Sequence, residues 1–292
     1  MAYYDSNPAN FATGRALTED ELRRAAPSIF ATEAHDSRSD RFHAIPTIQV
    51  LKVLEKEGFH CVGARQSTSR DVSKKDFTKH LLRLRRLDNE TAHSVGGTVC
   101  EVLLKNANDG TSAYELMAGL FRIQCLNSLV SQTSTLDSLK VRHTGDVAGK
   151  VIEGTWRVLG EAQKALKAPA DWSAINMAPE ARVILAEAAH VLRFGDADGE
   201  TDTPIKPAQL LAIRRREDDR NDLWTTFNRV QENVIAGGLR ARRPNELDER
   251  GRMQRGRAVT TRRVNGIDQD VKLNKALWTL TEKMAALLKS AA

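Results

Sequence analysis

The chain has few of the features that mark secreted, membrane or disulfide-bonded proteins. Its 292 residues contain only three cysteines, Cys61, Cys100 and Cys125, which are widely spaced and lie in apolar stretches. We expect them to be buried thiols in a reducing cytoplasm rather than a disulfide framework. No apolar run approaches the ~20 residues of a membrane span, and the N-terminus lacks the basic and apolar regions of a signal peptide. A cytoplasmic protein with no membrane partner is therefore expected.

Motifs of catalysis and cofactor binding are missing as well. The sequence has no P-loop, no dinucleotide-binding glycine motif and no nucleophile elbow. His60 and Cys61 are adjacent, so in a strand they point to opposite faces and cannot share one metal ion. Cys125 has no base within local reach, which favours a core thiol over a nucleophile. Glu101 and Asp109 lack a partner at a spacing that makes an acid–base pair. We predict no catalytic residues, no metal and no cofactor, hence a non-enzymatic protein.

Aromatic residues make up only 5% of the chain, whereas 41% of its residues are hydrophobic. We therefore expect a core built mainly of Leu, Val, Ile and Ala. A helix is predicted over residues 47–57, and a turn at Asn108-Asp109-Gly110. The pattern predicts strands over residues 59–65, 77–87, 99–106 and 139–143. Residues 114–125 fit a strand or a helix, and Gly119 within the run favours a strand.

Beyond residue 146 the hydrophobic period becomes helical. Helices are predicted over residues 147–166, 179–194 and 221–235 and after residue 268, separated by Gly- and Pro-rich breaks. In the second helix we expect four residues to face inward: Ile184, Ala188, Val191 and Leu192. The sequence thus predicts an α+β fold: an antiparallel sheet core flanked by helices and followed by a mainly helical C-terminal part.

The expected domain organisation has three parts. Residues 1–40 form an irregular N-terminal segment with one short helix, capped by Thr18 and Glu21 in a capping box. Residues 41–170 form the α+β core. Residues 171–292 form the helical C-terminal part, which contains an arginine-rich segment at 238–263.

The first concentration of positive charge lies around the second predicted strand. Eight basic residues crowd there against only Asp71 and Asp76: Arg65, Arg70, Lys74, Lys75, Lys79, Arg83, Arg85 and Arg86. Phe77, Lys79, Arg83 and Arg85 fall on one pleat face if the strand is regular. Two or three of these basic residues could simply lie on an exposed face of the sheet, where long cationic side chains prevent an edge strand from pairing with a strand of another chain. A groove that follows a phosphate backbone explains a net charge of +6 on one hairpin better.

The second concentration consists of arginine alone. Residues 212–263 hold fourteen arginines, no lysine and eight acidic residues, an excess equal to the net charge of +6 of the whole chain. In residues 214–229 the signs alternate, so internal salt bridges and a role in ligand binding are equally acceptable interpretations. Residues 240–263 contain Pro and Gly breaks and nine arginines, and such a flexible segment commonly contacts nucleic acid.

Five segments resemble, in this order, the phage/plasmid-like proteins that share the domain of unknown function 932. They are RFHAIPTIQVLKVLEKEGF (41–59), FTKHLLRLRRL (77–87), NANDGTSAYELMAGLFRIQCLNSL (106–129), LKVRHTGDV (139–147) and VKLNKALWTLTEKMA (271–285). The resemblance spans about residues 41–285. It implies a protein of a mobile genetic element in a bacterial host cell and supplies no established activity.

The predicted order of a helix, antiparallel strands and a long helix also matches the outline of phage single-strand annealing proteins, in topology and charge alone. We therefore expect a homo-oligomeric protein that binds DNA, single strands above all, in annealing and recombination. The expected contacts are Lys74, Lys75, Phe77, Lys79, Arg83, Arg85 and Arg86, with Arg250, Arg252, Arg255 and Arg257 as an auxiliary basic segment. The competing hypothesis is a phage or plasmid accessory protein whose arginine-rich segment binds an acidic host protein.

Overall fold

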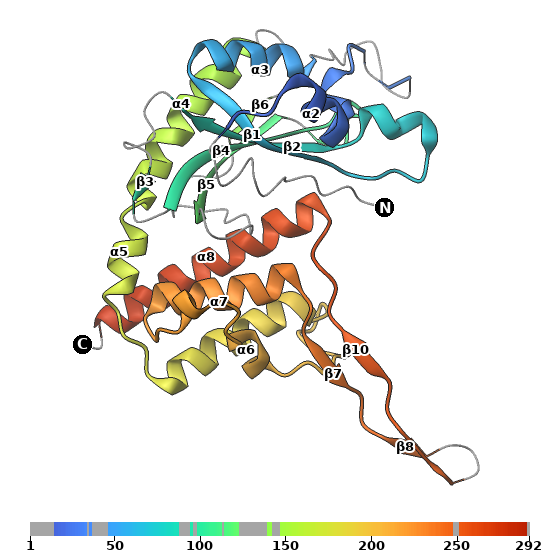
Figure 1. Ribbon diagram of the computed structural model, residues 1–292, viewed down its shortest axis with the longest axis vertical. Coiled ribbons are helices and arrows are strands. Elements are labelled where there is room, and N and C mark those ends of the chain that lie inside the picture. Colours follow the sequence, from blue (N-terminus) through green and yellow to red (C-terminus); the bar gives the residue numbers. More distant parts are fainter. Residues whose placement is uncertain are drawn as a thin grey trace. The chain divides into compact units, whose positions relative to one another are not determined.

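The computed structural model divides the chain into two compact units, Met1–Lys167 and Ala168–Ala292. It describes residues 15–33, 35–36, 46–87, 94–95, 98–112, 114–122, 139–141, 147–247 and 251–290. The first unit runs from blue to green in Figure 1 and the second from yellow to red. None of the described helices is long and apolar enough to cross a membrane.

Unit 1 contains an antiparallel sheet with the strand order β1-β2-β4-β5-β6, and β3 pairs with β4. The strands are β1 (Phe59–Gln66), β2 (His80–Arg86), β3 (Ser94–Val95), β4 (Thr98–Asn106), β5 (Tyr114–Arg122) and β6 (Leu139–Val141). The α+β prediction is confirmed, and so is the choice of a strand for the ambiguous run that begins at Tyr114. The turn at 108–110 joins β4 to β5, and Gly110 takes a positive φ of 74° there.

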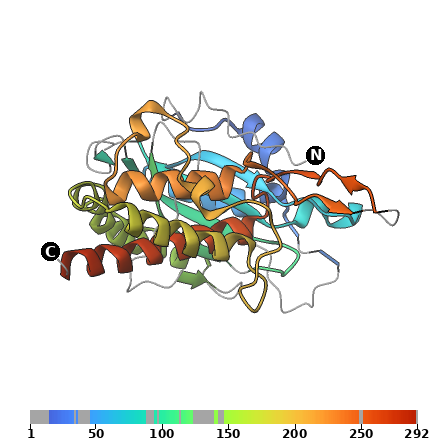
Figure 2. The same ribbon diagram turned by 90° about the horizontal axis from the view of Figure 1, so that it is seen from below.

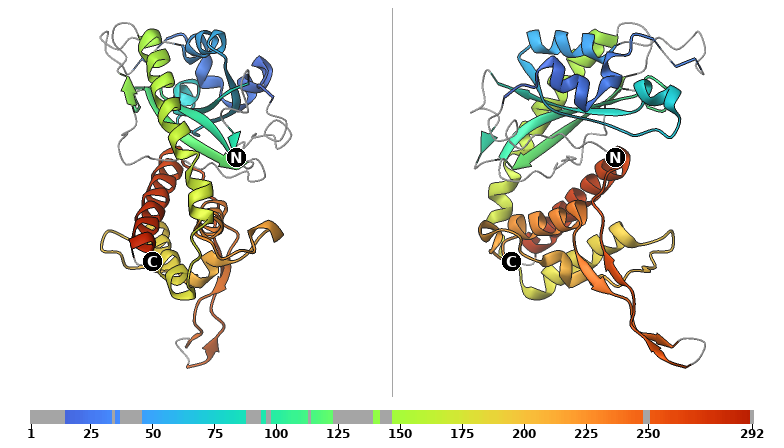
Figure 3. Two further views of the ribbon diagram at one scale, coloured as in Figure 1. Left: turned by 90° about the vertical axis from the view of Figure 1, so that its left-hand side faces the viewer. Right: turned by 45° about the vertical axis from the view of Figure 1, so that its right-hand side comes forward.

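Helices cover one face of this sheet (Figure 3). They are α2 (Glu19–Ala25), α3 (Thr47–Lys56) and α4 (Val147–Ala165). Two 3₁₀ helices also belong to this unit: η1 (Pro27–Phe30), which follows α2, and η2 (Val72–Phe77), which lies between β1 and β2. The predicted capping box of α2 is present: the Thr18 side chain accepts from the Glu21 backbone, and the Glu21 carboxylate accepts from the Thr18 backbone. The shared core is aliphatic, with Leu51 and Leu54 of α3 against Leu82 and Leu84 of β2.

A buried hydrogen-bond network joins the N-terminal elements to β2 and β4. The two ring nitrogens of His80 lie 2.9 Å from the hydroxyl oxygens of Ser28 and Thr47. Thr47 also accepts from the Asn106 amide at 3.2 Å and lies 3.3 Å from the Tyr114 hydroxyl. Burial raises the pKa of Tyr114 to about 12. The Asn106 side-chain oxygen has no hydrogen-bond partner among the described residues, but the His80, Thr47 and Ser28 side chains are bonded to one another. These bonds fix α3 on the sheet.

The two described cysteines are buried thiols, as predicted. Cys61 on β1 and Cys100 on β4 are both free and buried. Burial raises the pKa of the Cys61 thiol to about 12 and also raises that of Cys100. Cys125 lies outside the described residues.

Unit 2 packs helices α6, α7 and α8 against one another (Figure 2). Its elements are α5 (Ala168–Ser173), α6 (Pro179–Phe194), η4 (Pro207–Leu211), η5 (Arg216–Asp218), α7 (Leu223–Ala236) and α8 (Ile267–Ser290). Four aromatic rings form its centre: Trp172, Trp224, Phe227 and Trp278, with centroids 4.5–6.1 Å apart. Most of the other buried apolar residues of this unit are Leu, Val, Ile and Ala, so the prediction of a mainly aliphatic core is confirmed.

The predicted inner face of α6 is also wrong. Ile184, Val191 and Leu192 are 56%, 46% and 43% exposed, and the buried residues are Leu185, Ala186, Ala189 and His190. His190 Nε2 lies 2.7 Å from the Ile205 carbonyl oxygen. The helix has two apolar stripes, and the one with small alanines packs closely against its neighbours. The larger side chains therefore face outward.

Candidate nucleic-acid interface

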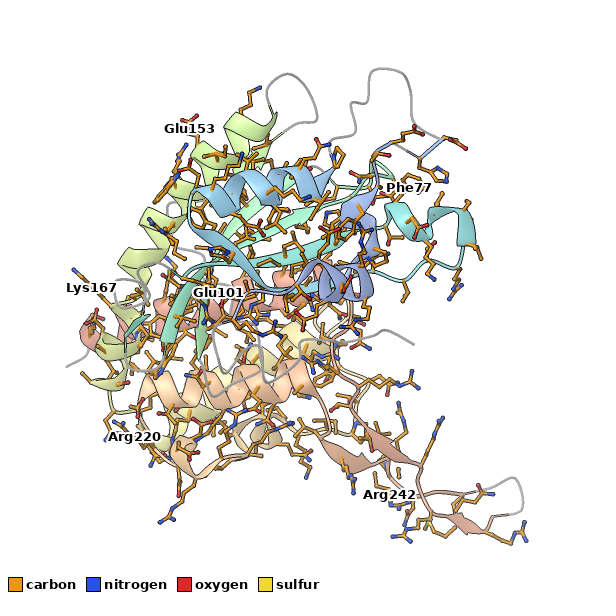
Figure 4. The ribbon with its side chains drawn as sticks, turned by 45° about the horizontal axis from the view of Figure 1, so that its top comes forward. Phe77, Glu101, Glu153, Lys167, Arg220 and Arg242 are labelled. Carbon is orange, nitrogen blue, oxygen red and sulfur yellow. The ribbon has the colours of Figure 1, made fainter. Side chains whose placement is uncertain are left out.

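The arginines of β2 alternate with its core leucines, so Arg83 and Arg85 lie on the face opposite the helices. Their side chains are nevertheless buried, at 7% and 5% exposure. Both donate to a single carboxylate, that of Glu101 on β4: Arg83 Nε to Oε2 at 2.7 Å and Arg85 Nη2 to Oε1 at 2.7 Å. Figure 4 labels Glu101 within the sheet. The prediction that Arg83 and Arg85 form an exposed phosphate-binding face is wrong, and so is the view of Glu101 as an unpaired carboxylate.

The Arg83 guanidinium also lies over the ring of Phe121 on β5, 3.5 Å from its centre. Burial lowers the pKa of Arg83, and the negative charge of Glu101 acts in the opposite direction. On the same sheet Lys105 Nζ lies 2.5 Å from Glu115 Oε2 across β4 and β5. This part of unit 1 is therefore a set of buried ion pairs that neutralises most of its own charge.

The other predicted contacts around β2 lie in different places. Phe77 is the last residue of η2 and makes an edge contact with the His35 ring at 5.4 Å, so it does not share a pleat face with Lys79. The side chain of Lys75 on η2 is exposed, and Lys74 is half-buried. At the far end of β2, Arg86 stacks on Trp156 of α4 at 4.7 Å. At ~3.3 Å per residue, β2 separates its two ends by about 20 Å, so these residues do not form one site.

Four of the five arginines in residues 214–229 bond within unit 2, namely Arg214, Arg215, Arg220 and Arg229. Arg214 Nε donates to the Asn233 side chain at 2.6 Å, and Arg215 pairs with Glu232 of α7. Arg229 donates to the backbone carbonyl oxygens of Asp218 and Arg220. The interpretation of this run as internal salt bridges is the one that the structure supports, because these bonds hold η5 and its flanking loops on α7.

Residues 238–263, here called the arm, form a two-stranded β-ribbon that projects from the helices of unit 2 (Figures 1 and 4). The arm consists of β7 (Arg240–Arg242) paired with β10 (Ala258–Thr260), and β8 (Glu246–Leu247) paired with β9 (Met253–Gln254). The described residues of the segment expected to be flexible thus form paired strands. The sequence signal for these strands, Arg-Ala-Arg against Ala-Val-Thr, is weak because each strand has only three residues.

Two glycines allow the arm to form. At Gly237 the chain turns out of α7 with φ 66° and ψ −150°, a conformation essentially restricted to glycine. A Cβ on Gly256 would lie 1.9 Å from the Arg243 carbonyl oxygen, so only glycine fits between the strands there. The Gly256 amide donates to the Asn245 side chain at 3.0 Å. Gly256 therefore lies at the irregularity between the two ladders.

Hydrogen bonds from the helical body fix the base of the arm. Gln209 of η4 donates to the Arg240 carbonyl oxygen at 2.9 Å, and Arg193 of α6 to that of Arg262 at 3.1 Å. Arg243 binds the Asp202 carboxylate through two bonds of 2.7 and 3.1 Å. The stem of the arm is thus a positioned element of unit 2.

The arm is strongly basic. Residues 238–263 contain nine arginines and three acidic residues, and no Phe, Tyr, Trp or His. Its exposed arginines are Arg240, Arg242, Arg252, Arg255, Arg257 and Arg262. Of the predicted auxiliary contacts, Arg252, Arg255 and Arg257 lie together on the arm, and Arg250 is outside the described residues. No group of three His, Cys, Asp or Glu residues in the described part of the chain is placed to hold a metal ion.

Comparison with known proteins gives a family. Residues 34–278 match the family described as "Domain of unknown function (DUF932)". Two proteins of Escherichia coli (strain K12), UPF0380 protein YafZ and UPF0380 protein YfjQ, are each 42% identical to the chain over 275 residues, which is 94% of either sequence. No solved structure shows a significant match.

Proposed function

This chain belongs to the DUF932 family, and from its own geometry we propose that it binds DNA through the arm and catalyses no reaction. The proposal rests on one observation: several arginines on the β-ribbon of the arm are exposed, among them Arg255 and Arg257. Guanidinium groups donate in a planar fork that matches phosphate oxygens. Each arginine that neutralises a phosphate releases counterions, which makes the affinity depend on salt.

The arm supports DNA binding better than the sheet of unit 1 does. Arg83 and Arg85 would have to leave a buried carboxylate to reach a phosphate, and removing one partner of such a pair costs about 3–5 kcal/mol. Arg255 and Arg257 are exposed. Lys74 and Lys75 on η2 remain a secondary cationic surface in this proposal.

The biological setting is also part of the proposal. We infer a protein of a phage or plasmid that acts in the cytoplasm and assembles into homo-oligomers, as the resemblance and the annealing-protein outline suggest. The preference for single strands rested on Phe77 and the β2 arginines, which do not form one face. Light scattering of the purified protein with and without DNA tests the oligomer.

The test of DNA binding is a salt series with matched variants. Changing Arg255 and Arg257 to Gln should lower the slope of log affinity against log salt by about 0.9 per lost phosphate contact on duplex DNA, hence by about 1.8. The control changes Arg24 of α2 and Arg157 of α4 to Gln, which removes the same charge from exposed helical positions outside the arm.

If the control lowers the slope equally, the change reflects only the net charge of the protein, and the arm is not the binding surface. A wild-type protein that binds no DNA at low salt would reject the proposal outright.

A protein partner is the second candidate, favoured by one observation. Leu247 and Met253 face each other across β8 and β9 and are 66% and 67% exposed. Two large apolar side chains on an exposed ribbon are typical of a protein contact. Changing both to Ser should abolish capture of a host protein from nuclease-treated extract and leave the salt slope for DNA unchanged. Unchanged capture would reject this candidate.

A further inference from the structure

The stem of the arm, β7 with β10, has two unlike faces. The register pairs Arg240 with Thr260 and Arg242 with Ala258, so these four side chains lie on one face. All four are exposed. We call this set the outer face.

The other face of the stem carries Ala241 paired with Val259, both half-buried, and the neighbouring Leu239 is buried. The Leu239 amide donates to the Thr261 hydroxyl at 2.9 Å, and the Thr261 amide donates to the Leu239 carbonyl oxygen at 2.9 Å. The apolar face therefore turns toward the body of unit 2, and the outer face is held away from it.

The outer face has the composition of a base-reading surface. Arg242 Nη1 donates to the Gly256 carbonyl oxygen at 2.7 Å, which steadies the guanidinium and leaves four of its five N–H donors for a ligand. Arginine reads guanine through O6 and N7, and small apolar or methyl-bearing side chains contact the thymine methyl group. Arg240 and Arg242 supply the first type of contact, and Ala258 and Thr260 the second.

The shape of the stem selects the kind of nucleic acid. A two-stranded ribbon fits the major groove of B-form DNA, which is about 12 Å wide. The deep, narrow major groove of duplex RNA excludes it. Binding of single strands relies on aromatic side chains that stack on bases, and the arm contains none.

We propose that the outer face of the stem enters the major groove of duplex DNA and reads sequence there, with Arg240 and Arg242 on guanine. This inference rests on the proposed function and deepens it: Arg255 and Arg257 supply affinity for the backbone, and the outer face supplies preference among sequences. The two roles are separable, because backbone contacts carry no sequence information directly.

The experiment selects bound duplexes from a randomised DNA library and then measures affinities for selected and scrambled duplexes. The wild-type protein should enrich a guanine-containing motif. Changing Arg240 and Arg242 to Gln should lower the ratio of selected to scrambled affinity by about tenfold or more, since each bidentate contact distinguishes bases by about that factor. The matched pair Arg255→Gln and Arg257→Gln should weaken both duplexes alike and keep the ratio.

A second variant tests whether a lower ratio could come from misfolding of the arm. Ala258→Gln keeps all charges and adds bulk to the outer face, so it should also lower the ratio while the affinity for scrambled DNA persists. If the wild-type protein binds all duplexes equally, the proposal that the outer face reads sequence is wrong, whereas the proposed DNA binding stands. Preference for single strands or duplex RNA over duplex DNA would overturn it too. Absence of any DNA binding would reject the proposed function itself.

Discussion

Two arginine-rich regions of this molecule have opposite surroundings. In the sheet of unit 1, Arg83 and Arg85 are buried and share the Glu101 carboxylate. In the arm of unit 2, Arg255 and Arg257 are exposed on a narrow ribbon. Both regions show a net charge of +6 in the sequence, yet Arg83 and Arg85 are buried and Arg255 and Arg257 are exposed.

A run of basic residues in the sequence does not by itself indicate a binding surface, because carboxylates from other elements of the fold can pair with those residues. Glu101 is 16 residues from Arg85 along the chain but adjacent to it across the sheet. In the part of the chain that the structure describes, β7 and β10 pair only with each other, and the four side chains of the outer face are exposed. Secondary structure and layer position thus decide whether an arginine stabilises the fold or remains available for binding.

The largest effect is expected from removing the shared carboxylate. Glu101→Gln leaves two buried guanidinium groups without a counter-charge, which should lower the free energy of unfolding by about 3–5 kcal/mol. Urea unfolding measures it, with Glu55→Gln on the exposed side of α3 as the control that should change stability by less than about 0.5 kcal/mol. Replacing Arg83, Arg85 and Glu101 together by Met should restore much of the loss. A loss below about 1 kcal/mol for Glu101→Gln would mean that water reaches these arginines, and the comparison with the arm would fail.

The next effect concerns the glycine from which the arm starts. A Cβ at Gly237 would lie 2.6 Å from the Arg262 carbonyl carbon, and its φ of 66° with ψ of −150° is unsuited to alanine. Gly237→Ala should therefore destabilise unit 2 by about 1–3 kcal/mol and weaken DNA binding with it. Gly160→Ala is the matched control, because nothing lies within 4 Å of a Cβ on that exposed residue of α4, and it should gain about 0.5–1 kcal/mol. Equal stability of the two variants would show that the base of the arm is not built as described.

Local patterns were enough to predict much of the fold. Short-range periodicity and turn residues predict the capping box of Thr18 and Glu21, the strands β1, β2, β4 and β5, and the helices α6, α7 and α8. The short helix α5 was not predicted. These signals work because each depends on residues within one or two turns of each other.

The candidate site was less predictable, because its features depend on distant neighbours. The pairing of Glu101 with the β2 arginines requires the register of β2 against β4, and the bonds of His80 join residues up to 52 positions apart. In α6 the period gave two apolar stripes, and only packing against α7 and α8 decides which one is buried. The arm was assigned correctly as basic, but its strands are too short for composition to distinguish them from an irregular segment.

A small effect is expected when the arm loses charge. Changing Arg255 and Arg257 to Gln should alter the free energy of unfolding by less than about 0.5 kcal/mol, since both side chains are exposed. Urea unfolding beside the salt series gives this value on the same samples. A loss comparable to that of Glu101→Gln would show that these arginines belong to the fold, and the contrast between the two regions would disappear.

The smallest effect concerns the ion pair at the base of the arm, Arg243 with Asp202. The hydrogen bonds from Arg243, and then its charge, lower the pKa of Asp202 below the ordinary value. A carboxylate with a lowered folded-state pKa contributes stability above its unfolded pKa of about 3.9, and the contribution is lost as the pH falls through the lowered value. Because Asp202 is 88% exposed, this contribution to stability should be slight. A carbon-13 NMR titration of the Asp202 carboxyl group should show a midpoint below about 3.9, and Arg243→Gln should return it to about that value. If Arg243→Gln leaves the midpoint unchanged, the pair does not persist in solution, and the base of the arm is held without it, by contacts that include the hydrogen bonds from Gln209 and Arg193.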